Sequence, residues 1–157
     1  MNILLFGKTG QVGWELQRAL APLGNLIALD VHSTDYCGDF SNPEGVAETV
    51  RSIRPDIIVN AAAHTAVDKA ESEPKFAQLL NATSVEAIAK AANEVGAWVI
   101  HYSTDYVFPG TGEIPWLETD ATAPLNVYGE TKLAGEKALQ EYCAKHLIFR
   151  TSWVYAG

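Results

Sequence analysis

The segment Gly7-Lys8-Thr9-Gly10-Gln11-Val12-Gly13 sets the architecture of this chain. It follows the short apolar run Asn2–Phe6, which predicts a buried strand. It opens Gln11–Ala21, where apolar residues recur with helical spacing. Glycines at a spacing of three, placed between a strand and a helix, are typical of a turn that binds a dinucleotide.

Each glycine of this turn has a separate physical purpose. Gly7 permits a tight bend, Gly10 lets the backbone approach a pyrophosphate, and Gly13 lets the helix pack closely on the sheet. The free amides of Gln11 and Val12 at the helix N-terminus then face the phosphates. A glycine turn without a ligand is the alternative interpretation.

Strand-like and helix-like stretches alternate along the rest of the chain. The further expected strands are Asn25–Asp30, Asp56–Asn60, Ala97–Ser103 and Leu147–Thr151. The further expected helices are Pro43 to about Arg54, Pro74–Val95 and Val127–Lys145, with a long loop at Thr104–Asn126. Strands separated by helices indicate parallel βαβ units. We therefore predict the α/β class: a doubly wound parallel sheet in a three-layer αβα arrangement, an NAD(P)-binding Rossmann fold, forming one domain over residues 1–157.

Composition and charge narrow the possible functions. The chain has 157 residues, is 48% hydrophobic and carries a formal charge of −8, which argues against a nucleic-acid binder. No stretch reaches the roughly 18 apolar residues of a membrane span, and no secretory leader is seen. Cys37 and Cys143 are isolated and lack metal-ligand spacing. We expect a cytoplasmic protein, and we expect no metal site, although a metal requirement is left open.

Asp30 ends the second expected strand, 20 residues beyond Gly10. At that position a carboxylate can accept hydrogen bonds from the adenosine ribose hydroxyls and repel a 2′-phosphate. No arginine lies nearby in the sequence, so NADH is favoured, with NADPH as a further possibility. The alternative is an exposed loop aspartate.

Tyr128 and Lys132 lie four residues apart at the start of the last expected helix. This spacing places the phenol and the ammonium on one face of a helix, about 5–6 Å apart at their Cβ atoms. A nearby fixed cation favours the phenolate, so we expect the tyrosine pKa to fall below its reference value of about 10. A tyrosine tuned in this way can exchange a proton near neutral pH.

Several runs in this order resemble the extended short-chain dehydrogenase/reductases along all 157 residues. They are the glycine turn, Asp30, Asn60-Ala61-Ala62-Ala63, Ser103-Thr104-Asp105-Tyr106-Val107-Phe108, Tyr128-x-x-x-Lys132 and Arg150-Thr151-Ser152-Trp153-Val154-Tyr155. Within that family the chain is most similar to the enzymes that reduce the keto group of a thymidine-diphosphate sugar. The resemblance implies reduction of dTDP-4-dehydro-L-rhamnose to dTDP-L-rhamnose, the last step of dTDP-rhamnose synthesis for cell-surface polysaccharide such as the O-antigen.

The resemblance also implies roles for individual residues. Tyr128 would protonate the C4 oxygen of the keto sugar as hydride arrives, and Lys132 would hold the nicotinamide ribose and lower the pKa of Tyr128. Thr104 matches a hydroxyl that hydrogen-bonds the substrate carbonyl, and Asp105 and Trp153 match sugar-contacting positions. The positions that match contacts along the cofactor are Asp39, Phe40, Ala62, Ala63, His64 and Tyr102.

Some of these assignments have alternatives. Thr104 follows an apolar strand and lies at its carboxyl end, where ligands bind in open α/β sheets, but neighbouring Ser103 competes for the same role. Trp153 could be a core residue. His64 and His101 are expected to be structural or cofactor-lining and not catalytic.

Chains of this family are roughly twice as long, and their C-terminal part builds much of the nucleotide-sugar pocket. We therefore expect this chain to be the cofactor-binding part, which binds NADH with little or no turnover, and the full-length protein to be a possible homodimer. Two alternatives are an epimerase or dehydratase acting on another nucleotide-sugar and a non-catalytic regulatory subunit that binds a dinucleotide.

Overall fold

The computed structural model describes residues 1–155. The strands are β1 (Asn2–Phe6), β2 (Asn25–Leu29), β3 (Ile57–Asn60), β4 (Trp98–Thr104) and β5 (His146–Thr151). The helices are α1 (Gln11–Leu20), α2 (Pro43–Ile53), α3 (Val67–Ser72), α4 (Pro74–Gln78), α5 (Ser84–Val95) and α6 (Val127–Tyr142). Ala156 and Gly157, the end of the predicted domain, lie outside the described residues.

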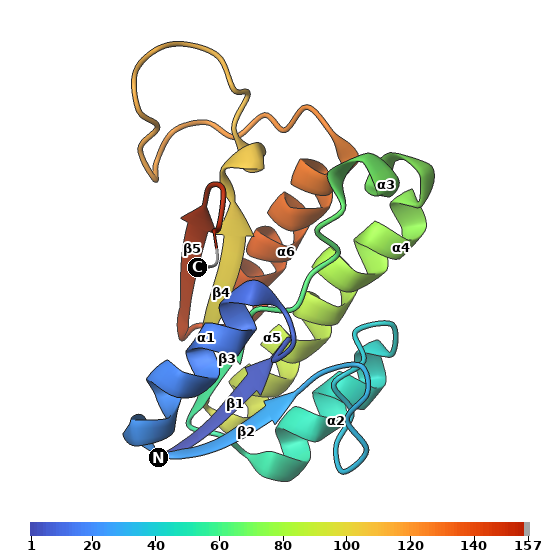
Figure 1. Ribbon diagram of the computed structural model, residues 1–157, viewed down its shortest axis with the longest axis vertical. Coiled ribbons are helices and arrows are strands. Elements are labelled where there is room, and N and C mark those ends of the chain that lie inside the picture. The colour runs from blue at the N-terminus through green and yellow to red at the C-terminus, as the bar shows by residue number, and fades with distance from the viewer. Residues whose placement is uncertain (156–157) are drawn as a thin grey trace.

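The five strands form one parallel sheet in the order β2-β1-β3-β4-β5. The chain passes from β1 to β2 on one side and then returns to β3, β4 and β5 on the other (Figure 1). This reversal makes the sheet doubly wound, with the switch between β1 and β3. The predicted fold class is confirmed.

Alternate residues of β1 pack into two separate cores. Leu4 and Phe6 belong to a large core against α2, α5 and α6, whereas Ile3 and Leu5 pack with residues of α1. Because successive strand residues point to opposite faces, helices cover both sides of the sheet (Figure 1). A strand buried on both sides needs a continuous apolar run, which Asn2–Phe6 supplies.

The expected single helix over Pro74–Val95 is wrong in detail, and α3 was not predicted. A π-helical turn at Leu79–Thr83 separates α4 from α5. It carries the buried side chain of Asn81, whose oxygen accepts from the His64 amide at 2.8 Å and whose nitrogen donates to Thr131 Oγ1 at 3.1 Å. The extra residue of a π turn is a known device at functional sites, and here it ties the loop after β3 to α6.

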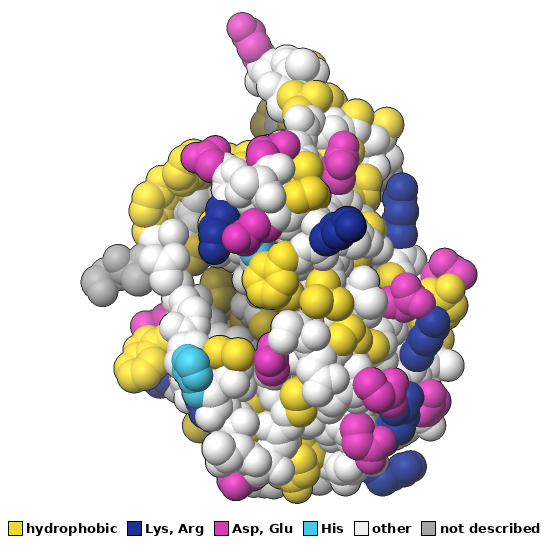
Figure 2. Space-filling model, turned by 90° about the vertical axis from the view of Figure 1, so that its right-hand side faces the viewer, with side chains coloured by type: hydrophobic (Ala, Val, Ile, Leu, Met, Phe, Trp, Pro, Cys, Tyr) yellow, Lys and Arg dark blue, Asp and Glu magenta, His cyan; other side chains and the backbone are white. Residues whose placement is uncertain are grey.

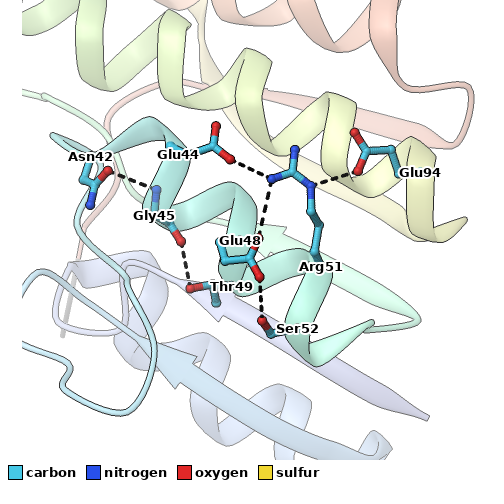
Figure 3. Close-up of polar contacts among 8 residues, drawn as sticks. All are labelled: Asn42, Glu44, Gly45, Glu48, Thr49, Arg51, Ser52 and Glu94. Carbon is cyan, nitrogen blue, oxygen red and sulfur yellow. Dashed lines mark hydrogen bonds and ion pairs between the residues drawn. The ribbon is translucent and has the colours of Figure 1, made fainter.

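The start of α2 follows the prediction. Asn42 caps the helix by accepting from the Gly45 amide at 3.0 Å, and Pro43 occupies the first turn. Figure 3 shows Arg51 reaching Glu44 at 2.8 Å and Glu94 of α5 at 2.9 Å. These carboxylates are largely exposed, so the pairs add little stability.

The surface agrees with the acidic composition. On the face that Figure 2 presents, basic side chains are scattered among acidic ones. Among the described helices, none combines the length and the apolar character that crossing a membrane requires.

The glycine turn gives a direct test of this packing. A Cβ at Gly13 would lie 1.9 Å from the Gly7 carbonyl oxygen, whereas a Cβ at Gly10 would meet that oxygen at an ordinary 3.5 Å. We expect Gly13→Ala to lower the free energy of unfolding by about 3 kcal/mol and Gly10→Ala by less than about 1 kcal/mol. Urea denaturation of the two variants measures both; equal costs would contradict the close approach.

Candidate functional site

The glycine turn places an open helix N-terminus at the carboxyl edge of the sheet. Gly7 has a φ of 87°, and a Cβ there would lie 2.7 Å from the backbone of Ala61 and Ala62. Only glycine fits this position. Gly10 is the N-cap of α1 and lines the cavity together with Gln11 and Val12, so an anion can approach the first amides of the helix.

A cavity of about 890 Å³ lies along this edge. It lies outside the carboxyl ends of the parallel strands, at the switch where the chain leaves β1 toward one face of the sheet and β3 toward the other. The predicted residues that line it are Gly7, Gly10, Gln11, Val12, Asp30, Asp39, Phe40, Ala62, Ala63, Tyr102, Thr104, Asp105, Tyr128, Lys132 and Trp153. Two predicted residues do not line it: Gly13 is buried under the turn, and His64 lies behind the wall.

Asp30 is a buried wall residue, so the exposed-loop interpretation is wrong. Its Oδ1 accepts from the His32 amide at 3.0 Å and from Ser33 Oγ at 3.2 Å, and Lys8 Nζ lies 3.9 Å away. Burial acts to raise the pKa of Asp30, but the two hydrogen bonds and the charge of Lys8 outweigh it and hold the pKa below its ordinary value. The carboxylate is therefore ionised at neutral pH.

Lys8 lies beside Asp30 but does not line the cavity, and sequence reasoning missed this contact. Its backbone amide donates to the Leu29 carbonyl at the end of β2, and its ammonium donates to Ser33 Oγ at 3.3 Å. The glycine turn thus places a cation next to Asp30. The sequence search looked for a cation near Asp30 along the chain and found no arginine. Lys8 escaped it because Lys8 follows β1 whereas Asp30 follows β2, and only the sheet brings the two residues together.

The Tyr128 and Lys132 side chains both reach the cavity from the first turns of α6. Asn126 caps the helix by accepting from the Gly129 amide at 2.7 Å. The Lys132 ammonium donates to the Tyr102 carbonyl at 2.7 Å, and the Tyr128 ring meets the Tyr106 ring edge-on at 5.6 Å. Helix spacing and these contacts fix both groups.

The expected lowering of the tyrosine pKa is wrong for this structure. Burial raises the pKa of Tyr128 above its ordinary value; Asp105 and Tyr106 raise it further, while the Thr104 hydroxyl acts in the opposite direction. Burial also lowers the pKa of Lys132 from 10.5 to about 8, partly offset by Glu136. Because its pKa lies above the ordinary value of 10, Tyr128 keeps its proton at neutral pH.

Ser103 and Thr104 both line the cavity, but their hydroxyls have different partners. Ser103 Oγ donates to the buried carboxylate of Glu136. Thr104 Oγ1 accepts from the Tyr106 amide at 3.2 Å and donates to Asp105 Oδ1 at 3.3 Å, within the cavity wall. The Thr104 hydroxyl also hydrogen-bonds Tyr128, which favours Thr104 over Ser103 as the hydroxyl beside the phenol.

Trp153 borders the cavity, whereas His64 does not line it. Trp153 is 74% exposed with a φ of 42°, so the core interpretation is wrong, and it borders the cavity. The buried His64 ring packs edge-on against Phe76 at 5.9 Å, and its Nε2 lies 3.6 Å from a Glu73 oxygen. Its position behind the wall fits a structural role better than direct contact with a ligand.

A buried ion pair below the site was also missed. Arg150 makes paired contacts to Glu136, with Nη2 2.6 Å from Oε2 and Nε 3.0 Å from Oε1. Its guanidinium lies 4.9 Å from the centre of the Phe108 ring and reaches the Glu118 carbonyl at 3.4 Å. The pair thereby joins β5, α6 and the long loop around the cavity.

Removing one partner tests this pair. Arg150→Met leaves the Glu136 carboxylate, which is 1% exposed, without its cation. We expect the free energy of unfolding to fall by about 3–5 kcal/mol. The matched control is Arg51→Met, which breaks surface pairs and should cost less than about 1 kcal/mol. Urea unfolding of both variants gives the comparison; similar losses would show that burial does not matter here.

Within residues 1–155, no group of three or more His, Cys, Asp or Glu side chains is placed to hold a metal ion. The polar side chains that line the cavity include hydroxyls, phenols, carboxylates and the Lys132 amine.

Similarity to characterised proteins extends over the whole chain. The dTDP-4-dehydrorhamnose reductase of Escherichia coli K12 is 96% identical over 157 residues, which cover 100% of this chain and 52% of that protein. This chain spans about half the length of the curated relatives it matches.

Solved structures agree with the sequence comparison. The dTDP-4-dehydrorhamnose reductase of Clostridium acetobutylicum superposes with a TM-score of 0.91 at 38% identity, covering 99% of this chain and 54% of that one. The enzyme of the same name from Bacillus anthracis, solved in complex with NADP, has a TM-score of 0.91 at 38% identity, covering 98% of this chain and 54% of that one. The model of the RmlD substrate binding domain matches residues 1–157, and this chain belongs to that family.

Proposed function

We propose that this chain is the cofactor-binding part of an NAD(P)H-dependent dTDP-4-dehydrorhamnose reductase. The full protein would convert dTDP-4-dehydro-L-rhamnose to dTDP-L-rhamnose, the last step of dTDP-rhamnose synthesis. One observation carries the proposal: Thr104, Tyr128 and Lys132 meet in the same cavity as the glycine turn and Asp30. A proton donor and a dinucleotide cradle in one cavity suit a carbonyl reductase.

The residues present fit a dinucleotide. Gly10 leaves space for a pyrophosphate over the first amides of α1, and ionised Asp30 can accept from ribose hydroxyls. Asp39, Phe40, Ala62 and the other wall residues supply the surface along which the rest of the cofactor would lie. When bound, the reduced nicotinamide supplies the hydride.

The protein's own groups supply the proton and the orientation. Tyr128 holds its hydrogen at neutral pH because burial raises its pKa, and it would donate that hydrogen to the C4 oxygen of the sugar. Thr104 would hydrogen-bond the same oxygen and fix the direction of transfer. Lys132 would hold the nicotinamide ribose, and Asp105 and the exposed Trp153 would contact the sugar.

The rest of the full-length protein would complete the nucleotide-sugar pocket. On this proposal the 157-residue chain binds NADH with little or no turnover, and the complete enzyme works in the cytoplasm as a homodimer. Fluorescence titration of the chain with NADH tests the first point directly, since saturable binding without sugar reduction is expected.

Tyr128→Phe tests the assignment of the acid. In the full-length protein we expect turnover to fall by about 10²–10⁴-fold, because the general acid is lost, while NADH affinity changes little. The rate of NADH oxidation measures turnover, and the NADH consumed per dTDP-L-rhamnose formed measures the stoichiometry. Unchanged turnover would overturn the role of Tyr128, and interconversion of sugars without net NADH consumption would point to an epimerase.

Lys8→Ala tests how the site treats NADPH. The Lys8 ammonium lies 3.9 Å from Asp30, where it can offset the repulsion between that carboxylate and a 2′-phosphate. We expect NADPH affinity to fall about tenfold, equivalent to about 1.4 kcal/mol, while NADH affinity stays within about twofold. The control is Lys145→Ala, because Lys145 binds the Gly96 carbonyl near the opposite edge of the sheet. Equal losses for the two cofactors would contradict the assignment.

A further inference from the structure

His101 lies beneath the site and joins β3 to α6. It is fully buried, as are its two side-chain neighbours Asn60 and Lys132. Asn60 and His101 are directly paired across β3 and β4, with Asn60 Nδ2 3.0 Å from His101 Nδ1. On the other side of the ring, His101 Nε2 lies 3.4 Å from Lys132 Nζ. The imidazole therefore contacts the lysine of the site through its second nitrogen.

The hydrogen bonds around Asn60 fix the tautomer of His101. The Ala62 backbone amide donates to Asn60 Oδ1 at 3.0 Å, and a backbone N–H can only donate. The oxygen of Asn60 is thus committed, and its NH₂ group faces Nδ1 of the ring. Because that NH₂ group is also only a donor, Nδ1 must accept and carries no hydrogen. Neutral His101 then carries its hydrogen on Nε2.

This tautomer presents an N–H group to Lys132. An ammonium has three donors and no acceptor, so two donors would face each other across the 3.4 Å contact. A neutral amine has a lone pair that can accept from Nε2–H while still donating to the Tyr102 carbonyl at 2.7 Å. The His101 contact therefore favours the neutral form of Lys132.

Other charged and titratable groups around Lys132 act in both directions. On α6, Glu136 favours the ammonium, but its carboxylate is already bound by Arg150 of β5 and by Ser103 of β4. Tyr128, one turn earlier on α6, keeps its proton and brings no negative charge, and Asp105 of the short helix after β4 lies near Tyr128. Burial lowers the pKa of Lys132 to about 8, and burial together with the Lys132 charge lowers the pKa of His101 well below its usual value.

We propose that Asn60 and His101 are positioning residues that control whether Lys132 is charged, by holding the imidazole as its Nε2–H tautomer. The lysine then changes its charge near physiological pH and not far above it. The consequence for catalysis rests on the proposed reductase function. If Lys132 holds the nicotinamide ribose, the charge beside that ribose and Tyr128 changes with pH in the physiological range. The tautomer and the charge of Lys132 are properties of the protein itself.

The experiment is nuclear magnetic resonance of the full-length protein without cofactor or sugar, with ¹⁵N-labelled histidine and lysine. Loss of signals in His101→Gln and Lys132→Met assigns the two side chains. We expect His101 to carry hydrogen on Nε2 only, and Lys132 to titrate near pH 8. Hydrogen on Nδ1, or titration of Lys132 at its ordinary value near 10.5, would overturn the proposal. These readouts need no turnover, so failure of the reductase proposal would leave them unaffected.

Asn60→Asp gives the sharper comparison. The carboxylate keeps an oxygen for the Ala62 amide but now accepts from Nδ1–H, so Nε2 becomes an acceptor facing Lys132. We expect the tautomer to switch and the pKa of Lys132 to rise from about 8 toward 10.5. The same substitution in a His101→Phe background should raise it less, because only the added charge acts there. Equal rises in both backgrounds would show that His101 does not relay the change.

Discussion

The backbone at Gly7 is the constraint on which the rest of the structure depends. Four elements meet there. β1 ends one residue earlier at Phe6, and the Gly7 amide donates to the Leu29 carbonyl at the end of β2. Ala61 after β3 and Gly13 of α1 approach the Gly7 backbone so closely that neither glycine has room for a Cβ. A side chain at either glycine would separate these elements. Their close approach keeps the N-terminus of α1 at the carboxyl edge of the sheet, where the cavity forms.

Below the cavity, polar side chains of β4 pair with polar side chains of α6 in two successive layers. His101 and Ser103 are two residues apart on β4 and face the same side; Lys132 and Glu136 are four apart on α6 and lie one turn from each other. The contacts pair them in order, His101 with Lys132 and Ser103 with Glu136. Buried polar groups are expensive unless they are paired. Arg150 and Asn60 complete the two layers by satisfying the remaining atoms.

Burial in these layers gives Tyr128 and Lys132 pKa values different from those that their spacing alone suggests. The spacing alone suggests a cation that makes the phenol acidic, but burial raises the pKa of Tyr128 and lowers that of Lys132. The tyrosine is therefore a protonated donor at neutral pH, and it lies beside a lysine whose pKa is lowered to about 8. Desolvation is the largest cause of both shifts.

The sequence by itself determined the fold class, the strand and most helix positions, and most residues of the cavity wall, because hydrophobic periodicity and glycine spacing are local signals. It did not locate α3, the π turn at Leu79–Thr83, or the contacts of Lys8 with Asp30 and Arg150 with Glu136. It also left the choice between Ser103 and Thr104 open. Those features depend on residues far apart in the chain, and only tertiary packing decided which hydroxyl was occupied, which charges were paired and which pKa values moved. The physical reason is that residue spacing sets which side chains share a face of one helix or strand. The burial and the partners of those side chains depend on the residues of the neighbouring helices and strands.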